Sequence, residues 1–551
     1  MISEKAKPWL AFALLGFIVL GISAYARPNF SFSWDSHNKL VQSFSLWEQG
    51  FSSDELFYHF STEDPNYRFF PHGANAFGKI DGRYVSAFPV ALAALFAPVW
   101  SFLGPAGVVL LSASFLIGCC WLLYRFWNFR GFWLFVPVLL TFLMSFTLEF
   151  SEHLIVAFLS FAGLSLWLKA KRPMLGGTVI ALALFFRHET LPLLLAVGMA
   201  SIASSLFETY AQKTIDSEKV VPEQSEAATS NNFFQRIKES GLLQFTLAAS
   251  ILVFSFSGFN LFLYGHPLGP RFLINASGLS VSPALRAEWA FDLLFWHNVK
   301  PGLFGYMPGL AFVLLIAIFF HRRLETVGRI LLGTVLIYIP VVLLIVPNNG
   351  IMDWGPRYFG PILLPSVVLA REIWHLKQVP ARRILQAFLI ALSLVTITLN
   401  YAGLKFLRNA RKTTATAIQQ MKDRNADVWV FAGIDIFYYS GVEYTRRPIL
   451  SINDHKELPE LLGLLQSSAP GKKILFIALP APMQESHSNR PDGAGTEAST
   501  ENEVLEMQVR NSLSPEEKSS IREFLMNPEN GIINPGLIYI EGIVKGPSDR
   551  N

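Results

Sequence analysis

The sequence predicts an α-helical polytopic membrane protein with about eleven transmembrane helices, a large first external loop and a small C-terminal α/β soluble domain. The first observation is composition: 52% of the 551 residues are hydrophobic and only 16% are charged, whereas soluble proteins carry about a quarter charged residues. The second is a series of long apolar runs between residues 8 and 402. The third is a return to soluble composition from about residue 405. The net charge of +4 is too small to indicate a nucleic-acid partner.

The first apolar run extends from Pro8 to Ala26 and has no clear small-residue cleavage pattern. It therefore predicts a retained first helix and not a cleaved signal peptide. Lys5 and Lys7 precede it, and basic residues favour the cytoplasmic side. This places the N-terminus in the cytoplasm and the polar segment 27–84 outside.

The later apolar runs predict the remaining helices. They lie at about 85–103, 105–124, 131–148, 154–168, 174–186, 190–207, 242–264, 303–320, 327–346, 358–371 and 384–402. The run at 85–103 is interrupted by Pro89 and Pro98, so whether it crosses the membrane decides the side of everything downstream.

Counting positive charges favours an interfacial position for 85–103. With that position, the basic clusters all fall on the cytoplasmic side, as is usual. These clusters are Arg125/Arg130, Lys169/Lys171/Arg172, Arg236/Lys238, His321/Arg322/Arg323 and Arg371 through Lys377 to Arg382/Arg383. The C-terminal domain is then external.

The division into domains follows the same composition changes. Residues 1–404 form the expected membrane domain, which includes the external loop 27–84 and a flexible cytoplasmic linker at 208–240. Residues 405–551 form the expected α/β domain, with a disordered insertion at 482–503. Buried strands are predicted at Asp427–Ala432 and Lys472–Leu479, with a helix over 457–466 between them.

The external loop 27–84 is too rich in aromatic residues for a disordered spacer. We interpret it as a folded cap over the bilayer surface that presents Asp35 toward the membrane. On the predicted topology, four further groups of polar residues lie on the same external side. They are Glu149–His153, Arg187–Glu189, Tyr264–Arg271 and Asp353–Tyr358. Ionisable groups beside apolar runs are costly and mark function or interior pairs, so they predict an active site between the helices and the cap.

These motifs resemble the GT-C superfamily of polytopic glycosyltransferases, which includes protein O-mannosyltransferases and the aminoarabinose transferase acting on lipid A. Trp34-Asp35 looks like the acidic site that follows the first helix in that family. Asp81–Pro89 looks like its approach to a second juxtamembrane helix, and Glu149–His153 occupies the place of its second acidic motif. Arg187-His188-Glu189 resembles a basic-acidic pair of many members, and Trp354–Tyr358 resembles a late external motif of bacterial relatives. The likeness covers roughly residues 1–400.

The resemblance implies transfer of a sugar from a polyprenyl-phosphate carrier to an acceptor hydroxyl of a protein, lipid or glycan. The reaction would take place at the outer, periplasmic face of the inner (plasma) membrane. Asp35 would be the general base, and Glu152 or His153 would orient the acceptor or share that role, with Glu149 as the other acidic candidate. The substrate-binding candidates are Arg83, His153, Arg187, His188, Glu189, Arg271, Asp353, Arg357 and Tyr358. Among them Arg83, Arg271 or Arg357 would stabilise the departing lipid phosphate.

Two departures from the family pattern leave assignments open. The first acidic site is a lone Asp35 and not an adjacent acidic pair, and Glu-x-x-Glu-His does not indicate which carboxylate corresponds to the second.

Structural roles are alternatives for the same residues. Asp35 is also a favoured helix N-cap, and Glu149 and Glu152 also suit a solvated helix–helix turn. Arg187 and Glu189 are i, i+2 neighbours that would not face each other on a helix, and Arg357 also suits a snorkelling interfacial arginine.

Other functions and cofactors also remain open. The histidines lack zinc-type spacing, and a divalent ion held by Asp35 and Glu152 has no motif in its support. The alternative functions are a transporter or flippase for a lipid or polar solute, and a glycan polymerase or ligase.

Overall fold

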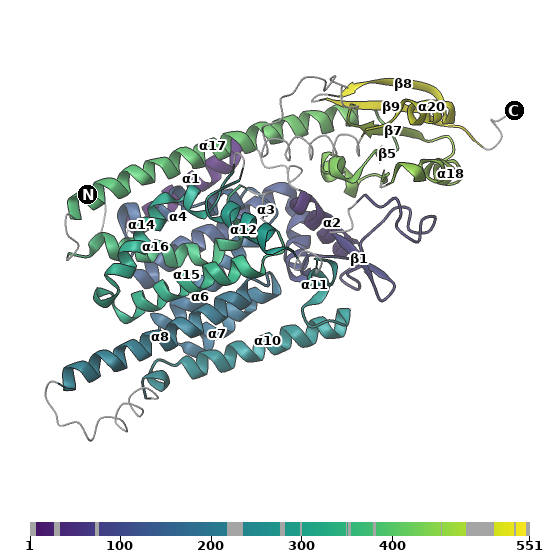
Figure 1. Cartoon of the computed structure of the whole chain (residues 1–551). Coiled ribbons are helices and arrows are strands. Elements are labelled where there is room, and N and C mark those ends of the chain that lie inside the picture. Colours follow the sequence, from purple (N-terminus) through teal and green to yellow (C-terminus); the bar gives the residue numbers. More distant parts are fainter. Residues whose placement is uncertain are drawn as a thin grey trace. The chain divides into compact units, whose positions relative to one another are not determined.

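The computed structural model divides the chain into two compact units (Figure 1). The membrane unit comprises residues 1–26 and 88–406, and the polar unit comprises residues 27–87 and 407–551. The structure describes residues 7–26, 34–71, 76–217, 235–275, 281–297, 300–348, 350, 354–377, 382–452, 454–480, 512–533 and 536–546.

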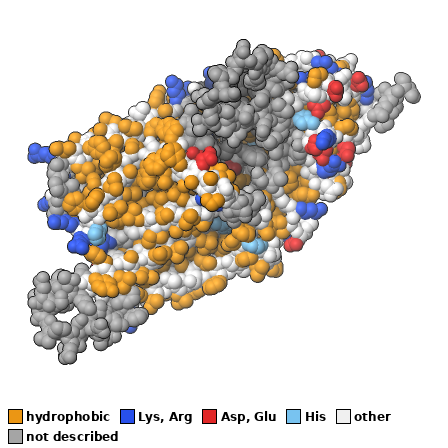
Figure 2. Space-filling model, viewed as in Figure 1, with side chains coloured by type: hydrophobic (Ala, Val, Ile, Leu, Met, Phe, Trp, Pro, Cys, Tyr) orange, Lys and Arg blue, Asp and Glu red, His pale blue; other side chains and the backbone are white. Residues whose placement is uncertain are grey.

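Six helices of the described chain are long and apolar enough to cross a membrane. They are α1 (Lys7–Ala26), α3 (Val90–Trp127), α8 (Thr190–Ser217), α10 (Leu242–Tyr264), α15 (Thr326–Ile345) and α17 (Arg382–Asp423). Further helices of the membrane unit are α6 (His153–Leu168), α7 (Pro173–Leu182), α11 (Gly269–Asn275), α12 (Pro283–Leu294), α14 (Pro308–Phe319) and α16 (Gly360–His375), with two-residue strands β3 (Trp296–His297) and β4 (Lys300–Pro301). Hydrophobic side chains cover most of the visible helical surface (Figure 2). The unit is therefore helical and multi-pass, while the count of about eleven spans stays a prediction.

Helix α3 joins two of the expected runs, 85–103 and 105–124, across a kink at Gly104. Gly104 has φ 58° and ψ −150°, a conformation that is essentially restricted to glycine. The chain therefore changes direction between the two runs while keeping one almost continuous helix. Helix α3 begins directly after Pro89, whose fixed φ suits a helix start.

The expected helix at 131–148 is wrong, because that stretch forms three short pieces. They are η1 (Gly131–Leu134), α4 (Val136–Leu139) and α5 (Leu143–Phe146). Pro137 lies in the first turn of α4, and Thr141 turns the chain by accepting a hydrogen bond from the backbone amide of Leu143 at 3.1 Å. An apolar run does not distinguish one long helix from short buried turns, since both bury every side chain.

Two further runs are also divided, whereas the runs 154–168, 242–264 and 327–346 match α6, α10 and α15 to within one residue at each end. Residues 174–186 form α7 and then η2 (Ala183–Phe185), and 303–320 forms α13 (Leu303–Tyr306) followed by α14. A 3-10 turn, η5 (His321–Arg323), follows α14 and carries one of the basic clusters.

The expected flexible linker at 208–240 is partly helical. Helix α8 continues to Ser217, and a further helical turn lies at 235–239. Glu208 on α8 accepts hydrogen bonds from Arg236 at 2.9 Å and from Arg329 on α15. These ion pairs stabilise the part of α8 that continues beyond the apolar run. The rest of the linker, 218–234, lies outside the described residues.

The C-terminal part of the polar unit is a five-stranded mixed sheet in the order β6-β5-β7-β9-β8. The predicted strands are confirmed as β5 (Val428–Phe431) and β7 (Lys473–Ala478), and the predicted helix as α18 (Leu458–Ser468). Additional elements are η7 (Ile434–Thr445), β6 (Ile449–Ser451), η8 (His455–Glu457), α20 (Pro515–Phe524), β8 (Leu525–Ile533) and β9 (Leu537–Val544). The predicted disordered insertion at 482–503 lies outside the described residues.

Residues 34–87 fold into the same unit as this sheet, whereas the sequence analysis places the 27–84 loop with the membrane domain. The segment forms α2 (Trp34–Glu48) and a hairpin of β1 (Phe77–Ile80) and β2 (Arg83–Ser86). The hairpin turns at Asp81 and Gly82, both with positive φ, as the tightest hairpin turns require.

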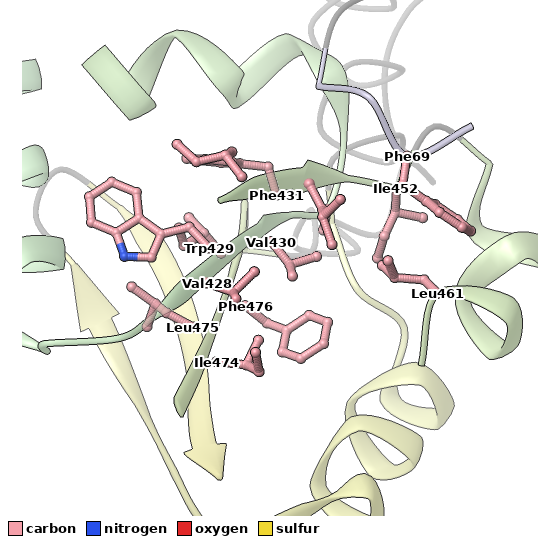
Figure 3. Packing of buried hydrophobic residues seen from close by; sticks show 14 of the residues in the cluster. Phe69, Val428, Trp429, Val430, Phe431, Ile452, Leu461, Ile474, Leu475 and Phe476 are labelled. Atoms are coloured by element: carbon pink, nitrogen blue, oxygen red, sulfur yellow. The ribbon is translucent and has the colours of Figure 1, made fainter. Parts of the chain in front are cut away.

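One hydrophobic core accounts for this grouping. Aromatic residues of the segment, including Tyr58, Phe69 and Phe70, are buried in one cluster with the sheet residues. Phe69 lies beside Ile452 and Leu461 (Figure 3), and its carbonyl oxygen accepts a hydrogen bond from the amide of Ser451 at 2.9 Å. After the membrane unit, the polar unit resumes inside α17 at Leu407.

Candidate functional site

The strongest candidate site in the membrane unit is centred on Arg187. Its Nη1 donates to Glu152 Oε1 at 2.7 Å and lies 3.1 Å from His153 Nδ1. Its Nε donates to Glu189 Oε2 at 2.9 Å, and its Nη2 donates to Glu189 Oε1. Three other residues predicted from the sequence, Glu152, His153 and Glu189, therefore meet around the buried Arg187 guanidinium.

The local backbone explains a contact that the sequence argument excludes. Residues 186–189 lie between the 3-10 turn η2 and helix α8 and are not helical. Arg187 and Glu189 can therefore face each other across this turn, and the two parallel hydrogen bonds give the pair a bidentate geometry. The expectation that these i, i+2 neighbours would point apart is wrong, because it assumed a helix.

Electrostatics keep this cluster charged despite its burial. Burial opposes the charge of Arg187, but Glu189 and Glu152 outweigh it and raise its pKa above the ordinary value. Burial likewise works against the Glu189 carboxylate, yet Arg187 and Arg271 hold its pKa well below the ordinary value. The ion pairs are thus formed across the whole physiological pH range.

Glu149 and Glu152 are both buried, at 3% and 1% exposure. The alternative of two solvated carboxylates on a helix–helix turn is therefore wrong. Glu152 immediately precedes α6, and its pairing with Arg187 makes it a member of this cluster.

A cavity of about 220 Å³ adjoins the cluster. Glu189, His188 and Arg271 line it on the polar side, and the remaining lining residues are mostly apolar. Arg271 lies on α11 with Nη2 3.7 Å from Glu189 Oε1. Its Nη1 is buried and has no hydrogen-bond partner within the part of the chain that the structure describes. Burial and the nearby Arg271 lower the pKa of His188 to about 4, so this histidine is neutral at physiological pH.

Arg357 and Tyr358 lie in the 3-10 turn η6 (Arg357–Phe359) beside the cluster. The Arg187 guanidinium lies over the Tyr358 ring at 5.7 Å, and Arg357 lies 5.4 Å from the same ring. Arg357 is 7% exposed, so the alternative of a snorkelling arginine at the membrane surface is wrong.

Sequence reasoning missed the residues that hold Tyr358 in place. Its hydroxyl donates to Asn348 Oδ1 at 2.6 Å, and its carbonyl oxygen accepts from the Tyr338 hydroxyl at 2.8 Å. Gly350, at φ +64°, leaves no room for a Cβ beside the Tyr358 ring. The turn signal Pro347–Gly350 is visible in the sequence, whereas its contact with Tyr358 is not.

The other predicted site residues lie in the polar unit or outside the described chain. Asp35 is half-buried in the first turn of α2, where a negative charge suits the helix dipole. Helix α2 already begins at Trp34, so Asp35 is not its N-cap. Arg83 on β2 pairs with Asp54 at 2.6 Å. Asp353 lies outside the described residues.

No group of three or more His, Cys, Asp or Glu side chains converges within the described ranges. Glu152 and Glu189 already bind the Arg187 guanidinium, which neutralises part of their negative charge. The alternative of a divalent ion on Asp35 and Glu152 stays untested, and we build no chemical step on it.

No family model matches the sequence, and no curated protein is similar to it. Among solved structures, the chain is similar to the oligosaccharyltransferase of Archaeoglobus fulgidus. For the apo form of that protein, the sequence identity is 12% and the TM-score is 0.40. The match covers 83% of this chain and 66% of that one. For its complex with Zn and sulfate, the sequence identity is 12% and the TM-score is 0.39. That match covers 84% of this chain and 67% of the other. The chain thus spans about two thirds of that protein, and at these scores the function has to be argued from the residues.

Proposed function

We propose that the protein is a glycosyltransferase that moves a sugar from a lipid-phosphate-linked donor to an acceptor hydroxyl at the membrane. The observation that carries this proposal is Arg271, which lines the 220 Å³ cavity with a buried Nη1 that lacks a hydrogen-bond partner among the described residues. Glu189 is already neutralised by Arg187, so the charge of Arg271 is only partly compensated.

A phosphate is the ligand that this chemistry fits best. A guanidinium binds phosphate oxygens with two parallel hydrogen bonds, and the strength of such bonds rises where water is excluded. The cavity is also lined by Leu268, Phe272 and Ile345, among other apolar residues. A phosphate joined to a hydrocarbon chain presents both surfaces, which favours a lipid-linked donor over a free nucleotide sugar.

The proposed reaction gives one role to Asp35 and another to Arg271. The Asp35 carboxylate accepts the proton of the acceptor hydroxyl, whose oxygen attacks the anomeric carbon of the sugar. The bond between that carbon and the phosphate oxygen breaks, and the lipid phosphate leaves with the electron pair. Arg271 stabilises the charge that develops on the leaving phosphate. The role of Asp35 as the base rests on the resemblance of Trp34-Asp35 to the acidic site of the GT-C superfamily.

The proposed side of the reaction is the external, periplasmic face of the inner membrane, with the N-terminus in the cytoplasm. It rests on the basic clusters Arg125/Arg130, Lys169–Arg172 and Arg322/Arg323, because basic residues favour the cytoplasmic side. The cluster Lys169–Arg172 lies at the opposite end of α6 from Glu152.

Transfer of label from radiolabelled polyprenyl-phosphate sugars tests the proposal, in membranes that contain wild type or Asp35→Asn at equal protein abundance. We expect transfer by wild type and a loss of about 10²–10⁴-fold in Asp35→Asn, the contribution of a general base. Equal transfer by both proteins would remove Asp35 from catalysis. Absence of transfer by wild type from every carrier tested would favour the transporter or flippase.

A further inference from the structure

The membrane unit contains a second, larger cavity of about 560 Å³ that the proposed reaction does not use. It lies among α14, α16, α17 and the short elements of 131–140, and its lining is almost entirely apolar. On α16 it is lined by Ser366, Val367, Ala370 and Trp374, which share one face of that helix. Since these helices belong to the membrane unit, the molecules available to fill an apolar opening are the hydrocarbon chains of lipids.

Two tryptophans of the lining, Trp133 and Trp374, lie beside His375, Arg371 and Arg382, and we call these five residues the rim. Trp133 and Trp374 line it with their rings 5.9 Å apart, and the ring of His375 lies 6.2 Å from that of Trp133. Arg382 donates from Nε to the Trp374 carbonyl oxygen at 3.3 Å. Arg371 and Arg382 both lie close enough to His375 to act on it electrostatically. Tryptophans beside basic residues are the arrangement found where helices meet lipid headgroups.

This rim is distant from the candidate site. Helix α16 begins at Gly360, next to Tyr358 of the site, and ends at His375 of the rim. At 1.5 Å per residue, the fifteen steps between Gly360 and His375 separate the two ends by about 22 Å. A donor phosphate held near Arg271 therefore does not also occupy the rim.

We infer that this cavity holds an anionic phospholipid of the bilayer, with an acyl chain among α14, α16 and α17 and its headgroup phosphate at Arg371 and Arg382. Charge complementarity decides between lipid classes: Arg371 and Arg382 make the rim cationic and so select a net negative headgroup. The inference concerns a bound lipid and is independent of the transfer reaction.

Native mass spectrometry tests this inference on the full-length protein released from bilayers of equal phosphatidylglycerol and phosphatidylcholine. We expect wild type to retain phosphatidylglycerol over phosphatidylcholine by roughly fivefold per basic contact. Arg382→Gln should reduce that ratio, while Arg383→Gln, at the exposed neighbouring position, should not. Arg382→Lys should restore the preference, which separates the charge from the hydrogen bond to Trp374.

A second variant tests the cavity itself. Ala370→Phe places a ring in the space of the acyl chain and should reduce retention of both lipids. Equal retention of the two lipids by wild type would overturn the inference, as would an equal effect of Arg383→Gln and Arg382→Gln. Displacement of phosphatidylglycerol by equimolar polyprenyl phosphate would also overturn it, because the cavity would then belong to the donor.

Discussion

At the scale of single residues, the site is organised by opposite charges that compensate each other away from water. Arg187 satisfies Glu152 and Glu189 at once, and Arg271 adds a second positive charge beside Glu189. Removing one member of a buried ion pair is costly because the partner charge stays buried. Arg187 is therefore held by its two carboxylates and stabilises the fold. Arg271 is the arginine that we propose binds an anionic ligand.

Replacement of Arg187 should show that cost directly. Arg187→Gln leaves two buried carboxylates without their main counter-charge and should destabilise the protein by about 3–5 kcal/mol. Thermal unfolding of the purified protein in detergent measures the change. Arg172→Gln is the control, since Arg172 is exposed and lies between α6 and α7. Equal melting of the two variants would contradict a buried, compensated centre.

His37 in α2 gives a pH-dependent prediction for the polar unit. Its Nε2 lies 2.7 Å from the Gly441 carbonyl oxygen and 3.0 Å from Ser440 Oγ. Burial lowers the pKa of His37 from 6.5 to about 4, partly opposed by the hydrogen bond to Gly441. Because the folded pKa is depressed, the neutral imidazole contributes stability that is complete above pH 6.5 and is lost as the pH falls toward 4.

This contribution is on the order of 3 kcal/mol over the whole window. The difference in unfolding free energy between pH 7 and pH 4.5 should therefore be smaller in His37→Gln than in wild type. Glutamine keeps a hydrogen-bond donor near the place of Nε2 and does not titrate. An unchanged pH dependence would show that His37 is not buried in the folded protein.

Much of the residue-level site could be predicted from the sequence, because charged residues beside long apolar runs are rare and each one needs a reason. Glu152, Arg187 and Arg271 are predicted on that ground, whereas Tyr358 is predicted from the resemblance of Trp354–Tyr358 to a family motif. Their pairing could not be predicted, since it depends on a non-helical turn at 186–189 and on contacts between separate helices. The roles of the site residues in catalysis stay predictions.

At the scale of elements, glycines allow the helices to approach closely. A Cβ added to Gly177 on α7 would meet the carbonyl oxygen of Phe245 on α10, which belongs to a helix backbone and cannot rotate away. Small residues at such crossings are typical of membrane helices, where close packing drives association. Composition predicted the long helices, but it did not predict which glycines lie at a crossing.

Gly177→Ala should therefore separate α7 from α10 and destabilise the membrane unit by about 1–3 kcal/mol, the usual cost of overpacking. Gly198→Ala is a matched control on α8, because nothing lies within 4 Å of its added Cβ. That change should be neutral or slightly stabilising, since alanine favours the helix. Thermal unfolding of both variants in the same detergent is the measurement, and equal effects would contradict the crossing.

At the scale of the whole molecule, the unexpected finding is that the first polar segment and the C-terminal sheet share one core. More than 300 residues separate Phe70 from Trp429, yet both belong to the same buried cluster. Composition indicated that each region was folded, but nothing local in either sequence shows that they bury the same surface. Such long-range pairing is invisible to periodicity, which reports only on neighbours along one element.

Phe70→Ala tests this shared core. Phe70 is fully buried, so truncation should cost about 3–5 kcal/mol. If the core is common, amide hydrogen exchange should accelerate in β5 and β7 as well as in the mutated segment. Phe51→Ala, at an exposed aromatic residue of the same segment, should leave both strands protected. Faster exchange confined to residues 34–87 would contradict a single core.

The most direct test of the central claim is the kinetics of donor use by Arg271→Gln, with Arg322→Gln as the exposed control. If Arg271 binds the donor phosphate and stabilises it as it leaves, Arg271→Gln should lower kcat/KM for polyprenyl-phosphate sugar by at least about 10²-fold. Its KM for the acceptor should be unchanged, and Arg322→Gln should behave as wild type. Donor kinetics in Arg271→Gln equal to those of wild type would contradict the assignment of the 220 Å³ cavity as the donor-phosphate site.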